Sequence, residues 1–455
     1  MKTDRDSAVP DFIDVLIVDW QGKLRGKRLP GAFADKISNG KSRLPLSTQA
    51  QDIWNDDRDE IIELSLTIGD PDGLCVPGGN KIMRQPWNPT HAQVLTSLHE
   101  LDGQISEFDV RGVLMRELER WSALQWMPTV AVELEFYLFD ASTRTSGVPR
   151  VPQQLSLAGK PQDLQLYDLR VMDQVSGFLD KVTSYSESLN IPAQAALAEF
   201  GPGQFEINLE HRSNPLQAAD DAIIFKQLVD RAARDSGLYA SFMAKPYAEH
   251  GGSGQHVHVS VIDENGNNIF DQEDQPTRLL QAVSGCLEHM EDCLLMFAPH
   301  GNSYRRLLPE SFAPNRLDWG YDHRGVAVRL PETQGRNARL EHRVAGADAN
   351  PYLALASILG CVRHGLQDAK QPASKPLMPG DVPAATRLTH DWLTAIKAAR
   401  HSSLLVELLG SRFIEKFTAI KEQEAIWFNG QVNSCLLYTS PSPRDLSTSR
   451  MPSSA

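Results

Sequence analysis

The chain has little cysteine and no long apolar run, and these absences exclude several classes of protein. Cysteines number five, with no CxxC pair, a pattern that fits a reducing cytoplasm better than a disulfide framework or a zinc site. Cys286 and Cys293 lie seven residues apart in a helical pattern, which predicts two buried thiols on one side of a helix. No apolar run is long enough to span a bilayer. Residues 1–10 are polar and charged, without the apolar stretch of a signal peptide. We therefore expect a cytoplasmic protein with no membrane partner.

Positive charge is also in short supply. The chain has 45 Lys and Arg against 58 Asp and Glu, a net charge of -13. This balance argues against a broad nucleic-acid surface, so any phosphate site must be local. Neither a Walker A loop nor a GxGxxG motif is present, which excludes a P-loop enzyme and a Rossmann dehydrogenase. The 455 residues, 41% of them hydrophobic, are enough for two or three domains with a sizeable core.

Turn and cap signals divide the chain into parts. The apolar run 14–19, the turn at Gln21 and Gly22 and the run 23–29 predict a hairpin in a small N-terminal domain, residues 1–107. A second, α+β domain is expected over residues 108–435. Its helices are predicted to begin at three caps. They are Asp109, with a helix to about Leu124, Asn214-Pro215, with a helix to near Gly237, and Asn350-Pro351, with a helix through Leu359.

The last segment, residues 436–455, differs from the rest. It is rich in Ser and Pro and has no periodicity, which predicts a disordered tail. It also resembles translated sequencing-adapter read-through, so no part of the fold is expected there.

Several segments of the second domain alternate polar with apolar residues. Side chains alternate across a strand, so in residues 339–343 Arg339, Glu341 and Arg343 share one face and Leu340 and His342 the other. The same alternation runs through residues 130–138, 204–210 and 255–261, and arginines flank residues 326–328. One such strand is typical of a solvated edge. Several predict a curved antiparallel sheet whose charged face lines a cavity.

The residue types on that face indicate a particular chemistry. Crowded carboxylates repel one another and lose solvation, so cations must offset the cost. Carboxylates with one or two imidazoles suit Mg²⁺ or Mn²⁺ rather than zinc. Arginines hold carboxylate or phosphate bidentately. Divalent metals beside phosphate-binding arginines favour phosphoryl transfer from a nucleotide.

At these residues the sequence resembles the glutamine synthetase superfamily. The resemblance covers nearly the whole chain before residue 436, in the family's order, and includes a β-grasp-like N-terminal part. Any one motif is weak, but six in order are specific. They are Glu133-x-Glu135, 199–206, 252–258 (GSGQHVH), 302–306 (NSYRR), 324–329 and 339–352. The expected fold is therefore that of a glutamine synthetase.

The resemblance implies two or more divalent cations, Mg²⁺ or Mn²⁺, in each site. The residues that match the ligands of the first metal, which organises the glutamate site, are Glu135, Glu199 and Glu206. Those that match the ligands of the second, on the ATP phosphates, are Glu133, His256 and Glu341.

The resemblance also implies roles in binding glutamate and ATP. Arg306 and Arg343 match the arginines that hold the glutamate carboxylate, with Gly252 at a backbone contact. Arg324 matches the arginine that stabilises the transferring phosphoryl group. The positions that match the nucleotide side are His258, Ser260, Arg329 and Arg339.

Two departures from the pattern concern the amine. Glutamine synthetases carry a Glu on a flap that helps take a proton from ammonium, and here Phe312 stands in its place. Glu310, two residues away, could substitute for that Glu. The family's ammonium-binding Asp loop is not recognisable, although Asp52 or Asp56 could take its role. Gly251 also replaces a usual Asn. Because an apolar Phe312 better accepts the body of a larger amine, we expect a glutamate–amine ligase. Segments 44–47, 319–322 and 341–348 are similar to the γ-glutamylpolyamine synthetase branch.

Two other functions stay open. One is a true glutamine synthetase that uses ammonia. The other is a non-catalytic relative kept as an assembly, whose signature would be lost metal carboxylates. None of the six metal positions is lost here. The family assembles as stacked rings, so the resemblance implies a homo-oligomer, a dodecamer of two hexameric rings.

Overall fold

The computed structural model describes residues 9–142, 150–157, 160–161, 165–272, 275–309, 311–378 and 380–431. The predicted tail at 436–455 and Glu310 lie outside the described residues.

The N-terminal part contains two small sheets, of strand orders β2-β1-β6-β5 and β3-β4-β7. The predicted hairpin is confirmed, because β1 and β2 are antiparallel with Val18 opposite Leu24. Alternate residues of β1, Ile13, Val15 and Ile17, are buried on one face. The elements here are β1 (Phe12–Val18), β2 (Leu24–Pro30), α1 (Ala34–Ser38), β3 (Ser42–Pro45), α2 (Asp59–Ile62), β4 (Asp72–Val76), β5 (Met83–Gln85), β6 (Asn88–Leu95) and β7 (Ser97–His99).

One large sheet dominates the rest of the described chain, in the order β11-β12-β8-β14-β17-β16-β15, with β13 also paired to β8. Its neighbours are antiparallel except β15 and β16, which are parallel. The predicted antiparallel sheet is therefore confirmed. Its strands are β8 (Trp126–Asp140), β11 (Ala193–Ala198), β12 (Gln204–Leu209), β13 (Leu238–Ser241), β14 (Gln255–Asp263), β15 (Trp319–Tyr321), β16 (Val328–Glu332) and β17 (Arg339–His342). A separate pair is β9 (Ser156–Leu157) with β10 (Lys160–Pro161).

The three predicted N-caps are confirmed: the Asp109, Asn214 and Asn350 side chains accept backbone N–H bonds from the first turns of α3, α7 and α11. The helices are α3 (Val110–Ala123), α5 (Leu169–Gln174), α6 (Ser176–Leu189), α7 (Pro215–Arg234), α8 (Thr277–His289), α9 (Leu294–Phe297), α10 (Ser303–Arg306), α11 (Pro351–Asp368), α12 (Trp392–His401), α13 (Ser403–Leu409) and α14 (Ser411–Asn429).

Two local predictions about the helices are wrong. α11 continues past Leu359 to Asp368, because residues such as Val362 and Leu366 keep an apolar face packed in the core. Cys286 and Cys293 are both buried, but Cys286 lies in α8 and Cys293 caps α9, so they do not share a helix.

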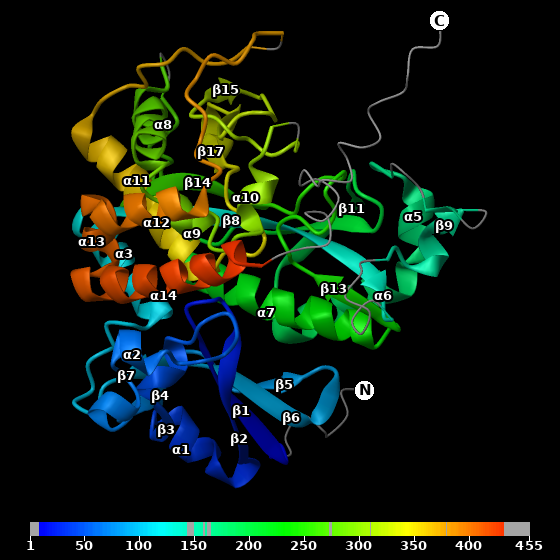
Figure 1. The fold of residues 1–455 in the computed structure, drawn as a ribbon, viewed down its shortest axis with the longest axis vertical. Helices are drawn as coiled ribbons and strands as arrows, with labels where there is room; N and C mark the ends of the chain where they lie inside the picture. Colours follow the sequence, from blue (N-terminus) through cyan, green and yellow to red (C-terminus); the bar gives the residue numbers. More distant parts are fainter. Residues whose placement is uncertain are drawn as a thin grey trace, which may run out of the picture.

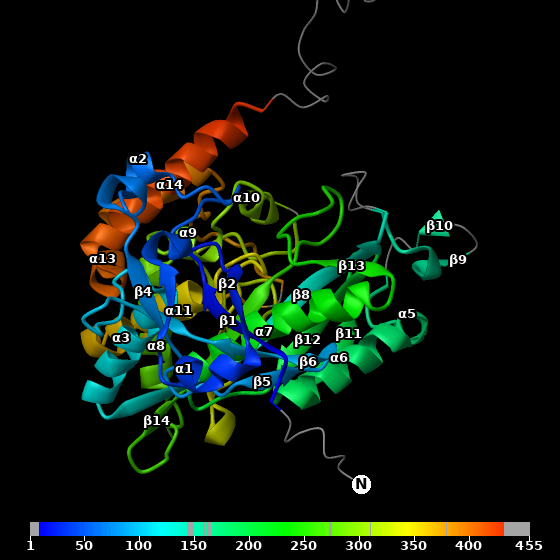
Figure 2. The same cartoon turned by 90° about the horizontal axis from the view of Figure 1, so that it is seen from below.

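Helices cover the apolar face of the large sheet. Val257 and Val259 of β14 pack in one buried cluster with residues of α3, α8 and α11, and Leu134 and Phe136 of β8 pack in another with α6 and α7. The N-terminal sheets lie at one end of the molecule, against α7 and α14 (Figures 1 and 2). Within the described residues, no helix combines the length and apolar character that a membrane span requires. The opposite, polar face of the sheet is therefore the place to look for a functional site.

Candidate active site

Four adjacent strands bring the predicted metal ligands together. Glu133 and Glu135 are alternate residues of β8, and the register places Glu206 of β12 opposite Glu135 and His256 of β14 opposite Glu133. On the next strand, β17, Glu341 pairs with His258. The alternation that was visible in the sequence therefore gathers these groups on one face of the sheet.

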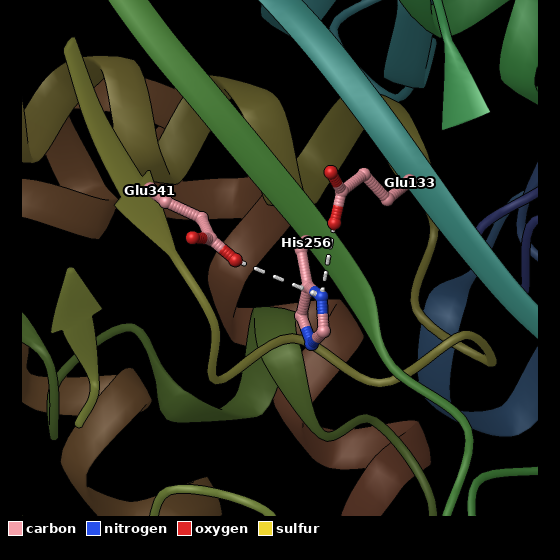
Figure 3. A group of neighbouring side chains, drawn as sticks. All are labelled: Glu133, His256 and Glu341. Carbon is pink, nitrogen blue, oxygen red and sulfur yellow. Dashed lines mark hydrogen bonds and ion pairs between the residues drawn. The ribbon is translucent and has the colours of Figure 1, made fainter. Parts of the chain in front are cut away.

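Glu133, His256 and Glu341 form one group of candidate metal ligands, with one ligand atom of each within 4.8 Å of the others. His256 lies between the two carboxylates (Figure 3). Its Nδ1 is 3.3 Å from Glu133 Oε2 and 3.9 Å from Glu341 Oε1. The structure thus brings together the three residues that match one predicted metal site.

A second group joins Glu135, Glu206 and His256, again within 4.8 Å. Glu135, Glu206 and His256 line a cavity, the first cavity. Glu199 follows β11 and also lines the first cavity, although it is not part of the close group. Oxygen-rich donors with a single imidazole suit Mg²⁺ or Mn²⁺. The residues present therefore fit divalent cations.

The crowding of these carboxylates changes their acidity. Burial, and then the nearby charges of Glu133 and Glu135, raise the pKa of Glu206 to about 9. Burial and the charge of Glu135 raise the pKa of Glu199 to about 7. Burial also raises the pKa of Glu133, but hydrogen bonds from His256 and His258 outweigh it and hold that pKa well below its usual range. A cation bound here would relieve the repulsion that raises the first two values.

Metal binding is therefore expected to release protons. Because the folded pKa values of Glu199 and Glu206 lie above their ordinary value, their contribution to stability is fully present at acid pH. It is lost as the pH rises through about 7 and about 9. The melting temperature of metal-free protein should fall across this range, and that of Mn²⁺-saturated protein should fall less. Titration calorimetry at pH 7 in buffers of different ionisation enthalpy measures the released protons. Glu206→Gln should release fewer protons on Mn²⁺ binding than the wild type. An equal number of protons would contradict the assignment of Glu206 as a metal ligand that is protonated in the metal-free protein.

Arg306, Arg343 and Gly252 also line the first cavity, of about 360 Å³. Arg306, which is 3% exposed, donates to Val344 O at 2.7 Å and Arg343 O at 3.3 Å. The Nε atoms of both arginines are buried and have no hydrogen-bond partner among the described residues. A Cβ on Gly252 would lie 2.5 Å from Ala244 O and 2.8 Å from Arg306 Cγ, so only glycine fits there. Buried donors without a partner, beside a bare backbone, fit a carboxylate ligand.

Glu341 is held from two sides and is 1% exposed. Arg329 Nη1 donates to its Oε2 at 2.8 Å, and Arg343 donates to its Oε1. Arg329 also pairs with Asp322. Arg324 lies in the turn before β16 and lines the first cavity.

A second cavity, of about 490 Å³, lies beside the first, and Glu133 lines both. His258, Ser260 and Arg339 line it, and Arg339 Nε donates to His258 Nδ1 at 3.3 Å. The predicted nucleotide residues are therefore grouped here, with the exception of Arg329, which is not among the lining residues.

Two residues outside the predicted set of site residues hold the ligands in place. Gln204 is 2% exposed and donates to Glu135 Oε2 at 3.1 Å. Asn208 Nδ2 donates to Glu133 Oε1 at 3.0 Å. Both residues lie two positions from Glu206 on β12 and so share its face of the sheet, which the sequence pattern shows. The spacing of residues along one strand does not show which side chains on another strand they bond.

Phe312 and the two carboxylates considered for amine deprotonation, Asp52 and Asp56, do not lie in one cavity. Phe312 lines the first cavity. Asp52 is 1% exposed and accepts hydrogen bonds from Trp54 N, Asp56 N and Arg58 Nε, within its own loop. Among the described residues that line the first cavity there is neither Asp52 nor Asp56.

The fold is that of the glutamine synthetase family. Residues 107–438 match the family model for the glutamine synthetase catalytic domain, and the chain belongs to that family.

Among curated relatives, the chain is 34% identical over 424 residues to gamma-glutamylputrescine synthetase PuuA of Escherichia coli (strain K12), covering 92% of this chain and 89% of that protein. It is 28% identical over 433 residues to the glutamate–isopropylamine ligase of a Pseudomonas species, covering 93% of each. The solved structure of GmaS without ligand superposes with a TM-score of 0.82 at 24% identity, over 97% of this chain and 99% of that one. This last likeness confirms the fold.

Proposed function

We propose that the protein joins the γ-carboxylate of glutamate to an organic amine or polyamine, with ATP as co-substrate. The observation that carries this proposal is Phe312. In the resemblance to glutamine synthetases it matches the position of a carboxylate that serves ammonium. In the structure it lines the same cavity as the carboxylates and arginines. The relatives named for putrescine and isopropylamine support it, as does a gamma-glutamylethanolamide synthetase of Streptomyces coelicolor, 29% identical over 367 residues.

In this proposal each group of residues has one task. Glu133, His256 and Glu341 would hold a cation at the ATP phosphates, and Glu135, Glu199 and Glu206 one at the glutamate site. Bound cations supply neutralisation of phosphate charge. His258, Ser260 and Arg339, which line the second cavity, would bind the nucleotide. Arg329 is not among its lining residues and pairs with Glu341 instead.

The reaction then has two covalent steps. With its carboxylate held by Arg306, Arg343 and the Gly252 backbone, glutamate attacks the γ-phosphorus through a side-chain oxygen, and ADP leaves. Arg324 stabilises the charge on the transferring phosphoryl group. The amine nitrogen next attacks the acyl carbon and loses a proton, and phosphate leaves as the amide forms.

The test is phosphate release from ATP with Mg²⁺ or Mn²⁺ and glutamate, across ammonia, methylamine, isopropylamine, ethanolamine, putrescine and spermidine. A higher kcat/KM for an organic amine than for ammonia is expected. Preference for ammonia would overturn the proposal in favour of a true glutamine synthetase. Absence of turnover with every amine, from folded protein, would favour a non-catalytic assembly.

We further propose a cytoplasmic homo-oligomer, a dodecamer of two hexameric rings, because family members assemble as stacked rings. Light scattering measures the mass of the particle. Twelve chain masses are expected, and a stable monomer would contradict this assembly.

A further inference from the structure

Aromatic side chains gather at one end of the first cavity. Phe200 and Phe312 stack with ring centroids 5.0 Å apart and planes 15° apart. Leu166 and Tyr167 line the same cavity. Phe312 is 68% exposed and Tyr167 58%, so this end of the cavity opens toward solvent. The charged groups and the apolar rings thus line one cavity, which has a polar part and an apolar part.

The backbone at this end is held in an unfavourable conformation at two places. Phe312 has a φ of +64° and Tyr167 a φ of +57°, in the left-handed region that bulky residues rarely adopt. Such residues cluster at functional sites, where the surrounding structure imposes the conformation.

Each strained residue is tied to an element that carries a site residue. The Ser311 hydroxyl, next to Phe312, donates to the backbone carbonyl of Arg306. Tyr167 N donates to Ala198 O at 2.9 Å, beside Glu199. The backbone that carries each ring is therefore hydrogen-bonded close to a residue of the polar part of the cavity.

The substrates of the proposed reaction differ in which parts of them could contact these aromatic side chains. Glutamate and the phosphates are charged and match the arginines and carboxylates. The carbon chain of an amine is the part that gains from contact with aromatic rings. Glu199, adjacent in sequence to Phe200, lines the same cavity and provides a carboxylate near the rings.

Building on the proposed function, we infer that Phe312, Phe200, Tyr167 and Leu166 form the subsite for the carbon chain of the amine. The ligand class is a primary aliphatic amine with several methylenes. Its nitrogen lies toward Glu199 and its far end toward solvent. Because the far end stays hydrated, a terminal methyl and a terminal ammonium are both accepted, and selection acts on the chain between them.

The experiment compares kcat/KM for methylamine, ethylamine, propylamine, butylamine and putrescine in the wild type, Phe312→Ala and Phe312→Gly. Full burial of a methylene corresponds to up to about fourfold per carbon, and at this open end we expect about twofold to fourfold. Phe312→Ala should reduce the butylamine-to-methylamine ratio at least about fivefold, and putrescine should fall by the same factor as butylamine. Phe312→Gly removes the ring and also relieves the left-handed backbone, so an equal loss assigns the effect to the ring.

Phe33→Ala is the matched control, because Phe33 is a 44% exposed phenylalanine outside the cavity lining. It should leave the ratio unchanged. A wild-type enzyme that uses organic amines, but whose ratio survives in Phe312→Ala, would overturn this subsite while the proposed function stands. A wild type that prefers ammonia would overturn the proposed function itself.

Discussion

Arg324→Ala is expected to lower kcat by about 10²–10³-fold, with the KM values for ATP and glutamate little changed. Arg324 lines the cavity that Glu199, Glu206 and Arg306 also line. Unlike Arg329 and Arg343, which grip Glu341, it lies in an exposed turn before β16. An arginine placed this way is suited to charge that develops only during phosphoryl transfer, and such contacts act on kcat rather than on ground-state binding.

Steady-state kinetics with saturating amine measure this split. Arg324→Lys keeps one positive charge but loses the planar fork, so it should recover only part of the rate. Arg305→Ala is the matched control, since Arg305 is exposed, lies 5.4 Å from the Phe428 ring and is not among the cavity residues. A rise in KM for ATP at unchanged kcat would make Arg324 a ground-state binding residue instead.

Much of the site could be predicted because β-strands encode their faces directly. The period of two placed Glu133 and Glu135 on one side of β8, and the same rule worked for Glu206, His256 and Glu341. Helix starts were equally readable, since Asp109, Asn214 and Asn350 act through local hydrogen bonds with their own first turns. Local sequence patterns were thus enough to predict the strand faces, the helix N-caps and the types of residue that gather in the carboxylate and imidazole groups.

Features that depend on distant partners could not be predicted. The end of α11 was placed too early because buried residues such as Val362 and Leu366 continue its apolar face beyond Leu359. The stacking of Phe200 on Phe312 joins residues 112 positions apart in loops. Whether a polar side chain such as Gln204 supports a ligand or faces solvent depends on which atoms meet it across the sheet, and spacing does not contain that information.

Both the nitrogen and the oxygen of the Gln204 side-chain amide form hydrogen bonds. Its Nε2 donates to Glu135 Oε2 at 3.1 Å and to Gly252 O at 3.0 Å. Its Oε1 accepts from Gly201 N at 2.9 Å and from the Tyr137 hydroxyl at 3.2 Å. One buried amide therefore joins a candidate metal ligand to the backbone of the candidate glutamate site.

Gln204→Ala is expected to weaken Mn²⁺ binding and raise the KM for glutamate, each by about 10–100-fold, while the KM for ATP changes little. Glu135 would keep the hydrogen bond from Gly254 N, at 2.9 Å, but would lose its second donor. Gln204→Met keeps a side chain of similar length but donates no hydrogen bond, so it should weaken Mn²⁺ binding by a similar factor. Calorimetry of Mn²⁺ binding and separate KM measurements for the two substrates give the comparison.

Gln165→Ala separates positioning from simple damage to the strand. The Gln165 side chain is also buried and bonds Gln204 O at 2.7 Å and Gly203 N at 3.1 Å, so it supports the same turn through the backbone. If Gln204 acts on Glu135 and Gly252, Gln165→Ala should lower the melting temperature with a smaller change in Mn²⁺ affinity. Equal losses of Mn²⁺ affinity and glutamate KM in the two variants would mean that the turn, not the amide of Gln204, positions the site.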